Sequence, residues 1–236
     1  MASAACSIPW RRSTEPASLI AAPAAPAPKP PGYSRFGLKV GVISGTDRMQ
    51  DFAATPDAAG TNYLDVRAGA PGLDWIDRSV SDLKHAGAAL IVLSLHWGPD
   101  LRTEPSDDFR RFARAAIERG VDVIHGHSAH VVQAIERYRH GIILYDTGNF
   151  IDDYWEIPLQ RTTWSFIFRL TVENGRPASL QLPPVLTHPF LAIATGELFH
   201  SIAETTRSRC AAFGTTVSTP PRGSRSHSIR PAGGDC

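Results

Sequence analysis

Short runs of apolar, mostly β-branched residues alternate with segments of helical periodicity through the middle of this 236-residue chain. The runs lie in residues 38–44, 88–95, 121–124 and 142–145, and their length is typical of strands in the interior of a sheet. Between them, apolar residues recur at helical spacing in two sets: Leu73, Ile76, Val80 and Leu83, then Phe109, Phe112, Ala116 and Ile117. Strands that alternate with helices form a mostly parallel sheet, so we expect an α/β fold.

Polar and glycine residues mark where these helices begin and end. Ser106 precedes the second helical segment and is a preferred N-cap residue, while Gly87 and Gly120 follow the two segments. After residue 149 the pattern changes: residues 164–170 alternate, and Asn174-Gly175 leads into residues 180–182, which predicts an antiparallel hairpin. Residues 195–213 predict a closing helix.

The two ends of the chain differ in composition from the middle. Residues 1–36 contain seven prolines, and residues 218–236 are rich in Pro, Gly, Ser and Arg with few large apolar groups. We therefore expect disordered tails at 1–36 and 218–236 on either side of one domain over residues 37–217.

Charge and cysteine content exclude several classes of protein. Lys plus Arg number 24 against 23 Asp plus Glu, so no net field attracts nucleic acid or an anionic membrane. No apolar run reaches the ~20 residues of a membrane helix. The three cysteines lie far apart, which argues against a disulfide framework or a thiolate metal site. Arg11-Arg12 precedes an Ala/Pro stretch and not the apolar core of a signal peptide, so we expect a cytoplasmic protein, or an exported one if the native start lies upstream.

Three histidines follow the predicted strands closely. His96 comes after residues 91–95, and His127 and His130 come after residues 121–124. Because the carboxyl ends of parallel strands form the ligand crevice of an open sheet, these side chains are expected to converge. Imidazole is the commonest metal ligand, so we predict a divalent metal ion, Mn, Fe or Zn, held by His96, His127 and His130. The alternative is that each ring only makes a hydrogen bond within a loop. That interpretation is the better one for any single histidine, whereas three histidines at strand ends favour a metal site.

Polar residues after the last predicted strand would reach the same rim. Asp146 and Asn149 could orient imidazoles or hold a substrate, although an Asx-type turn is an equally good interpretation of Asn149. The candidate catalytic residues are accordingly His127, His130 and Asn149. Trp97 is as typical of a core as of a site wall, and Asp152-Asp153 and the charged loop of Asp100, Arg102 and Glu104 are better explained as solvated surface.

Other chemistries lack their motifs. No G-x-S-x-G elbow is present, and Ser128 lies within the histidine cluster instead. No G-x-G-x-x-G or G-x-x-x-x-G-K-[ST] loop indicates a nucleotide.

Three blocks of sequence resemble a known family in order and spacing. Residues 94–100 read SLHWGPD, residues 119–133 read RGVDVIHGHSAHVVQ, and residues 143–150 read ILYDTGNF. They are similar to successive blocks of the CapA family of bacterial poly-γ-glutamate capsule synthesis proteins, which resemble calcineurin-like metallophosphatases. The resemblance covers roughly residues 37–215.

The resemblance implies a layered α/β sandwich with a histidine-rich dinuclear metal centre. It carries His96, His127 and His130 over as metal ligands, with Asn149 and Asp146 near the pocket and His125 in a supporting position. The family also has an earlier half, with an aspartate after its first strand and an Asn-Asn-His block, and this chain has neither. The sequence is therefore expected to be truncated on its amino-terminal side, with an incomplete metal centre in a partial metallophosphatase-like fold.

The function implied is a CapA-like role in poly-γ-glutamate or capsule biosynthesis, with a small-molecule or polyanionic substrate. Two alternatives stay open: a metal-dependent phosphoesterase of the calcineurin-like superfamily, and a non-catalytic fragment. If the protein is an enzyme, the resemblance implies a metal-dependent hydrolase. Its oligomeric state is not indicated by the sequence.

Overall fold

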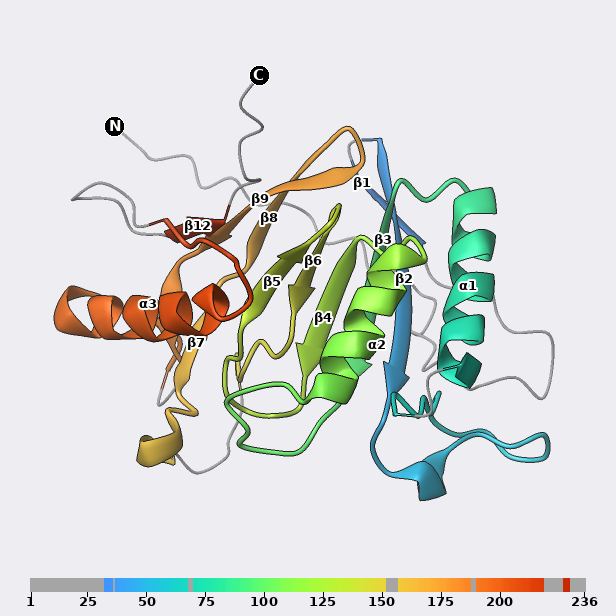
Figure 1. Ribbon diagram of the computed structural model, residues 1–236, viewed down its shortest axis with the longest axis horizontal. Helices are drawn as coiled ribbons and strands as arrows, with labels where there is room; N and C mark the ends of the chain where they lie inside the picture. Colours follow the sequence, from blue (N-terminus) through green and yellow to red (C-terminus); the bar gives the residue numbers. More distant parts are fainter. Residues whose placement is uncertain are drawn as a thin grey trace, which may run out of the picture.

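A computed structural model describes residues 32–35, 37–67, 70–151, 157–187, 190–218 and 227–229. The predictions of disorder for residues 1–31, 219–226 and 230–236 lie outside the described residues. Within the described part, the main feature is a six-stranded sheet with helices on one face and smaller sheets against part of the other (Figure 1).

The six-stranded sheet has the strand order β1-β2-β3-β4-β6-β5. Its central strands β2, β3, β4 and β6 are parallel, whereas the edge strands β1 and β5 run antiparallel to their neighbours. The strands are β1 (Gly32–Arg35), β2 (Leu38–Thr46), β3 (Leu90–His96), β4 (Val123–His127), β5 (Ile135–Tyr138) and β6 (Gly141–Leu144). The predicted parallel α/β sheet is therefore confirmed.

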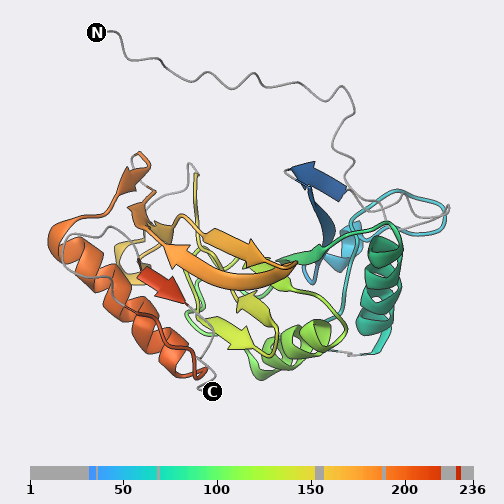
Figure 2. The same ribbon diagram turned by 90° about the horizontal axis from the view of Figure 1, so that it is seen from above.

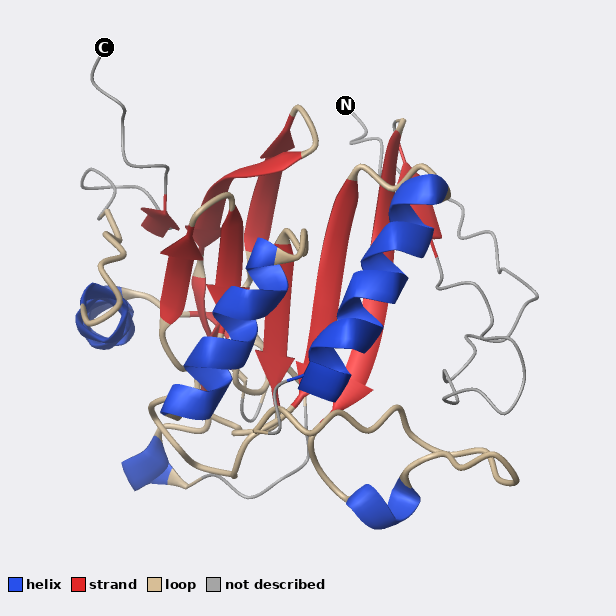
Figure 3. Cartoon of the chain, turned by 45° about the vertical axis from the view of Figure 1, so that its right-hand side comes forward, coloured by secondary structure: helices blue, strands red, loops and turns tan. Residues whose placement is uncertain are grey.

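Helices α1 (Ala70–His85) and α2 (Asp107–Glu118) lie side by side over one face of this sheet (Figure 3). Ser106 caps α2 as predicted, because its hydroxyl accepts a hydrogen bond from the Phe109 amide at 3.3 Å. The apolar stripes of both helices pack on alternate residues of the strands, such as Ile43, Leu93 and Ile124, all at most 1% exposed. This is the main core of the molecule.

The second half of the chain covers part of the opposite face (Figure 2). It contains a three-stranded sheet of β8 (Arg169–Glu173), β9 (Arg176–Leu182) and β12 (His227–Ile229), and another of β7 (Trp164–Phe166), β10 (Pro184–Leu186) and β11 (Ala192–Ile193). Helix α3 (Gly196–Ala211) packs beside them. A second core forms where Phe166 and Leu180 meet Ile142 and Leu144 of β6.

Several boundaries differ from those predicted. Strands β1 and β12 occur inside the predicted tails, since each pairs along one edge with β2 or β9, a contact that local composition does not reveal. The alternating run 164–170 is divided between β7 and β8, which belong to different sheets. The β5 strand was not predicted, because it combines two buried residues with two half-buried polar or aromatic ones. Two short 3₁₀ helices, Gln50–Phe52 and Pro158–Gln160, complete the elements.

In the described part of the chain, no helix is both long and apolar enough to cross a bilayer.

Candidate functional site

Strands β3 and β4 bring two of the predicted histidines together. Their parallel register pairs Ser94 with His125 and His96 with His127, so these side chains point to the same face of the sheet, away from α1 and α2. The rings of His96 and His127 meet edge to face with 5.3 Å between their centres. Both histidines were predicted to follow the strands, but they are the last residues of β3 and β4. The pairing of these strands continues as far as His96 and His127.

His125 supports this pair from the next position along β4. Its ring centre lies 5.3 Å from that of His127. Its Nδ1 lies 3.0 Å from the Ser94 hydroxyl, and its Nε2 lies 3.3 Å from the Thr147 hydroxyl. Both ring nitrogens therefore have hydrogen-bonding partners, which leaves neither for a metal ion.

His130 lies on the loop between β4 and β5. Its Nδ1 is 2.8 Å from the amide oxygen of Asn149, which fixes the ring against the segment that follows β6. The predicted proximity of His130 and Asn149 is thus present, and Asn149 acts here as a side-chain partner of an imidazole. Residues His130 and Ser128 have φ values of 61° and 129°, in the region that non-glycine residues rarely adopt.

Burial favours the uncharged form of three imidazoles on β3 and β4, those of His96, His125 and His127. Burial lowers the pKa of His127 to about 4, helped by the neighbouring rings of His125 and His96. The pKa of His96 is lowered by burial and then by the charge of Arg48, and that of His125 by burial alone. Neutral imidazole is the form that binds metal ions, so the electrostatics suit cation binding.

Asp47 and Arg48 belong to the rim, although sequence reasoning missed them. The Asp47 carboxylate accepts the Gly98 amide at 2.9 Å, and Arg48 donates to the Gly98 carbonyl at 2.6 Å. Burial raises the pKa of Asp47, and the His96 ring lies within reach of its charge. A signal was available, since Asp47 lies three residues after the predicted strand 38–44 and directly follows the observed β2.

Asp146 lies beneath the histidine loop and is 2% exposed. One carboxylate oxygen accepts the Ala129 amide and the other accepts the Gly148 amide, each at 2.8 Å. Burial raises its pKa to about 7, against the lowering effect of these two bonds. The structure gives this carboxylate backbone amides as partners, and its predicted place near a pocket stays a prediction.

The weaker candidates separate into core and surface. Trp97 is 2% exposed, stacks on Phe109 and donates to the Tyr145 carbonyl at 2.8 Å, so it is a core residue. Asp100 lies at the surface, 3.8 Å from Arg48. Asp152-Asp153 lie outside the described residues.

The donor atoms of this cluster suit a metal ion in type but not in arrangement. Two imidazoles that share a cation at about 2 Å from each nitrogen have ring centres roughly 5 Å apart, which matches the pair His96 and His127. Among the described residues, however, no group of three or more His, Cys, Asp or Glu is placed to hold a metal ion. The described part of the chain does not form a closed metal site by itself.

A mostly parallel α/β sheet with imidazoles at the carboxyl ends of adjacent strands defines a partial metallophosphatase-like α/β protein. Residues 23–154, more than half of the chain, match the family described as bacterial capsule synthesis protein PGA_cap, and the chain belongs to that family.

Individual relatives agree with this assignment. The chain is 34% identical over 105 residues to the capsule biosynthesis protein CapA of Bacillus anthracis, a match that covers 44% of this chain and 25% of the relative. It is 33% identical over 106 residues to the PGA biosynthesis protein CapA of Bacillus subtilis strain 168, covering 44% and 26%. A probable polyglutamine synthesis accessory protein of Mycobacterium tuberculosis is 42% identical over 67 residues, covering 28% and 17%. The matched part of this chain thus spans about a quarter or less of each relative.

Proposed function

We propose that this chain is a part of a capsule or poly-γ-glutamate biosynthesis protein, and that His96, His127 and His130 supply some of the ligands of a divalent metal ion. The observation that carries the proposal is the pair of neutral imidazoles, His96 and His127, facing each other at the carboxyl ends of adjacent strands. Membership of the PGA_cap family and the names of the relatives support the biosynthetic role.

The chemistry of the pair favours Zn, Fe or Mn, with Zn and Fe preferred by imidazole alone and Mn by added carboxylate. Asp47 is the nearest carboxylate to His96 that follows a strand, and Asn149 holds the third ring. The remaining ligands would come from outside the described residues. A complete centre of this kind would act as a Lewis acid on an anionic substrate, which makes a metal-dependent hydrolase the proposed enzyme class.

Metal binding by the whole chain tests the proposal. The triple variant His96→Ala, His127→Ala, His130→Ala is compared with the matched control His85→Ala, His140→Ala, His200→Ala, whose histidines lie on α1, on the β5–β6 turn and on α3. Calorimetric titration with Zn²⁺ and Mn²⁺ is expected to show binding by the wild type and the control, weakened at least tenfold in the first variant. Equal binding by all three proteins would overturn the proposed site.

A non-catalytic role is the second candidate, favoured by the lack of a three-ligand group among the described residues. The two candidates differ in turnover of a generic phosphodiester, bis-p-nitrophenyl phosphate, with added Mn²⁺. Turnover that the first triple variant abolishes and the control retains would support the hydrolase. A folded wild type that binds Mn²⁺ without turnover would support a non-catalytic metal-binding part.

A further inference from the structure

The loop between β4 and β5 holds its backbone in an unfavourable conformation at two positions. Ser128 has φ 129° and His130 has φ 61°, and neither residue is glycine. Such conformations cost about 1–3 kcal/mol each and persist only where surrounding contacts hold them. Since the loop carries His130 to the rim, the contacts that hold it also decide where that ring lies.

Ala129, the residue between the two strained positions, is held in place by a buried carboxylate. The Ala129 amide donates to the Asp146 carboxylate at 2.8 Å, and the Ala129 side chain is 1% exposed. The other oxygen of Asp146 accepts the Gly148 amide at 2.8 Å. One buried carboxylate thus joins the histidine loop to the turn after β6.

The turn after β6 contacts the loop at a second point, the ring of His130. Asn149 lies three residues after Asp146, and its amide oxygen is 2.8 Å from His130 Nδ1. The main-chain carbonyl of Asp146 also accepts the Gln133 amide at 3.0 Å, near the end of the loop. Residues 146–149 therefore fix the loop at its backbone, at its ring and at its exit.

We infer that Asp146 is a positioning residue for His130: its carboxylate fixes the backbone of residues 128–130, and thereby the place of the His130 ring on the rim. The Asp146 carboxylate contacts backbone amides, and the proposed role is to hold the loop. The inference rests on the loop geometry alone. Only its consequence for cation binding depends on the proposed function.

The substitution Asp146→Asn isolates this role, since asparagine has the shape of aspartate but only one acceptor oxygen. Its amide group must face either the Ala129 or the Gly148 amide, so one of the two bonds is lost. In metal-free, chelator-treated protein with ¹⁵N-labelled histidine, we expect the His130 ring signals to shift and broaden, while those of His85 and His200 stay in place. Whichever of the Ala129 and Gly148 amides loses its acceptor is expected to exchange with solvent at least about tenfold faster.

The control is Glu136→Gln, which alters another carboxylate that is 2% exposed and belongs to a different network of the same sheet. This variant is expected to leave the His130 ring signals and Ala129 exchange unchanged, even if it lowers stability. Asn149→Ala, which removes only the ring contact, is expected to move the His130 signals and leave Ala129 exchange as it is.

Two outcomes would overturn the inference: unchanged His130, Ala129 and Gly148 signals in folded Asp146→Asn protein, or equal changes in the Glu136→Gln control. If Asp146→Asn does not fold, the wild-type protein still provides a test, because an Ala129 amide that exchanges as fast as an unbonded loop amide contradicts the proposed bond. All these measurements are made without metal. Failure of the wild type to bind Zn²⁺ or Mn²⁺ would therefore reject the metal site and leave the role of Asp146 standing.

Discussion

The two faces of the six-stranded sheet are built from alternate residues of the same strands, yet they have opposite characters. The face under α1 and α2 is dry and closely packed, with Leu93, Leu95 and Ile124 fully buried. On the other face, apolar residues pack over β5 and β6, whereas Ser94, His125 and His127 on β3 and β4 are half-buried. One face supplies the stability of the fold, and the other supplies the chemistry of the rim.

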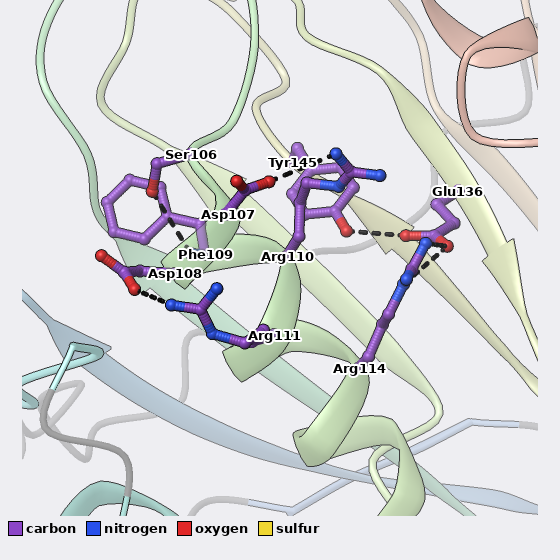
Figure 4. Close-up of polar contacts among 9 residues, drawn as sticks. All are labelled: Ser106, Asp107, Asp108, Phe109, Arg110, Arg111, Arg114, Glu136 and Tyr145. Atoms are coloured by element: carbon purple, nitrogen blue, oxygen red, sulfur yellow. Dashed lines mark hydrogen bonds and ion pairs between the residues drawn. The ribbon is translucent and has the colours of Figure 1, made fainter.

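A polar network lies inside the first face, between α2 and the strands β5 and β6. Glu136 on β5 receives bonds from Arg114 of α2 at 2.6 Å and from the Tyr145 hydroxyl at 2.6 Å, as Figure 4 shows. Tyr145 precedes Asp146, and its carbonyl accepts the Trp97 indole. These contacts hold α2, β5 and the residues that follow β3 and β6 together on the packed face.

The largest effect is expected from Gly126→Ala, on the packed face between His125 and His127. An added Cβ would lie 2.1 Å from the Tyr145 carbonyl oxygen and 2.4 Å from the Trp97 indole nitrogen. Relief requires backbone movement, so the free energy of unfolding should fall by at least about 3 kcal/mol, measured by urea denaturation. Gly87→Ala is the control: with φ 83° and open space around it, it should cost only about 1–2 kcal/mol. Equal losses would mean that the contact at Gly126 is not tight.

Adjacent residues of β3 give the next test. Leu93→Ala empties a fully buried site on the packed face and should lower the free energy of unfolding by about 2–5 kcal/mol. Ser94→Ala, on the other face, removes hydroxyl contacts to His125 at 3.0 Å and His127 at 3.4 Å and should cost about 1 kcal/mol or less. The order is expected to reverse in the histidine NMR spectrum: Ser94→Ala should shift the ring signals of His125, and Leu93→Ala should leave them in place. A larger loss of stability in Ser94→Ala would reverse the proposed division of the faces.

A smaller effect is expected from Tyr145→Phe, which deletes a hydroxyl that donates to buried Glu136 at 2.6 Å. The carboxylate keeps Arg114 as a partner, so thermal and urea unfolding should report a loss of about 1–2 kcal/mol. Tyr138→Phe is the matched control, since its hydroxyl bonds Glu118 at 2.8 Å in an exposed pair and should cost less than about 0.5 kcal/mol. Indistinguishable losses would argue that the network adds nothing to the packed face.

The packed face was the part that the sequence predicted well. Apolar periodicity located α1 and α2 within a few residues of their ends, and the short apolar runs located the parallel strands. The approach of His96 to His127 also followed from the rule that strand ends meet at one edge. These features depend on local pattern, which a sequence contains.

The other face was predicted less well because its features depend on contacts between distant segments. Asp146 holds Ala129 across 17 residues, and no local pattern distinguishes this carboxylate from an Asx turn. The β12 strand is recognisable only from its partner β9. Strand β3 reads as uniformly apolar up to Ser94, so the sequence did not reveal that alternate residues face different environments.

The smallest effect is expected at Asp122, near the amino-terminal ends of the strands, far along the sheet from the rim. Its carboxylate accepts the Ile91 amide at 2.8 Å, and burial raises its pKa from the ordinary value of 3.8, against the opposing effects of that bond and of His140. A raised pKa means that the folded protein binds this proton more tightly than the unfolded chain, so stability falls as the pH rises from 3.8 through the raised pKa and is level above it.

Asp122→Asn keeps an oxygen for Ile91 but cannot ionise, so the variant should gain stability relative to the wild type across that window, as measured by urea unfolding at pH 4, 5, 6 and 7. The Nε2 atom of His140 lies 3.9 Å from the carboxylate, so the comparison is repeated in a His140→Asn background. A difference between the proteins that does not change with pH in either background would contradict the role of burial at Asp122, and would leave the packed face without a measurable electrostatic contribution at this end of the sheet.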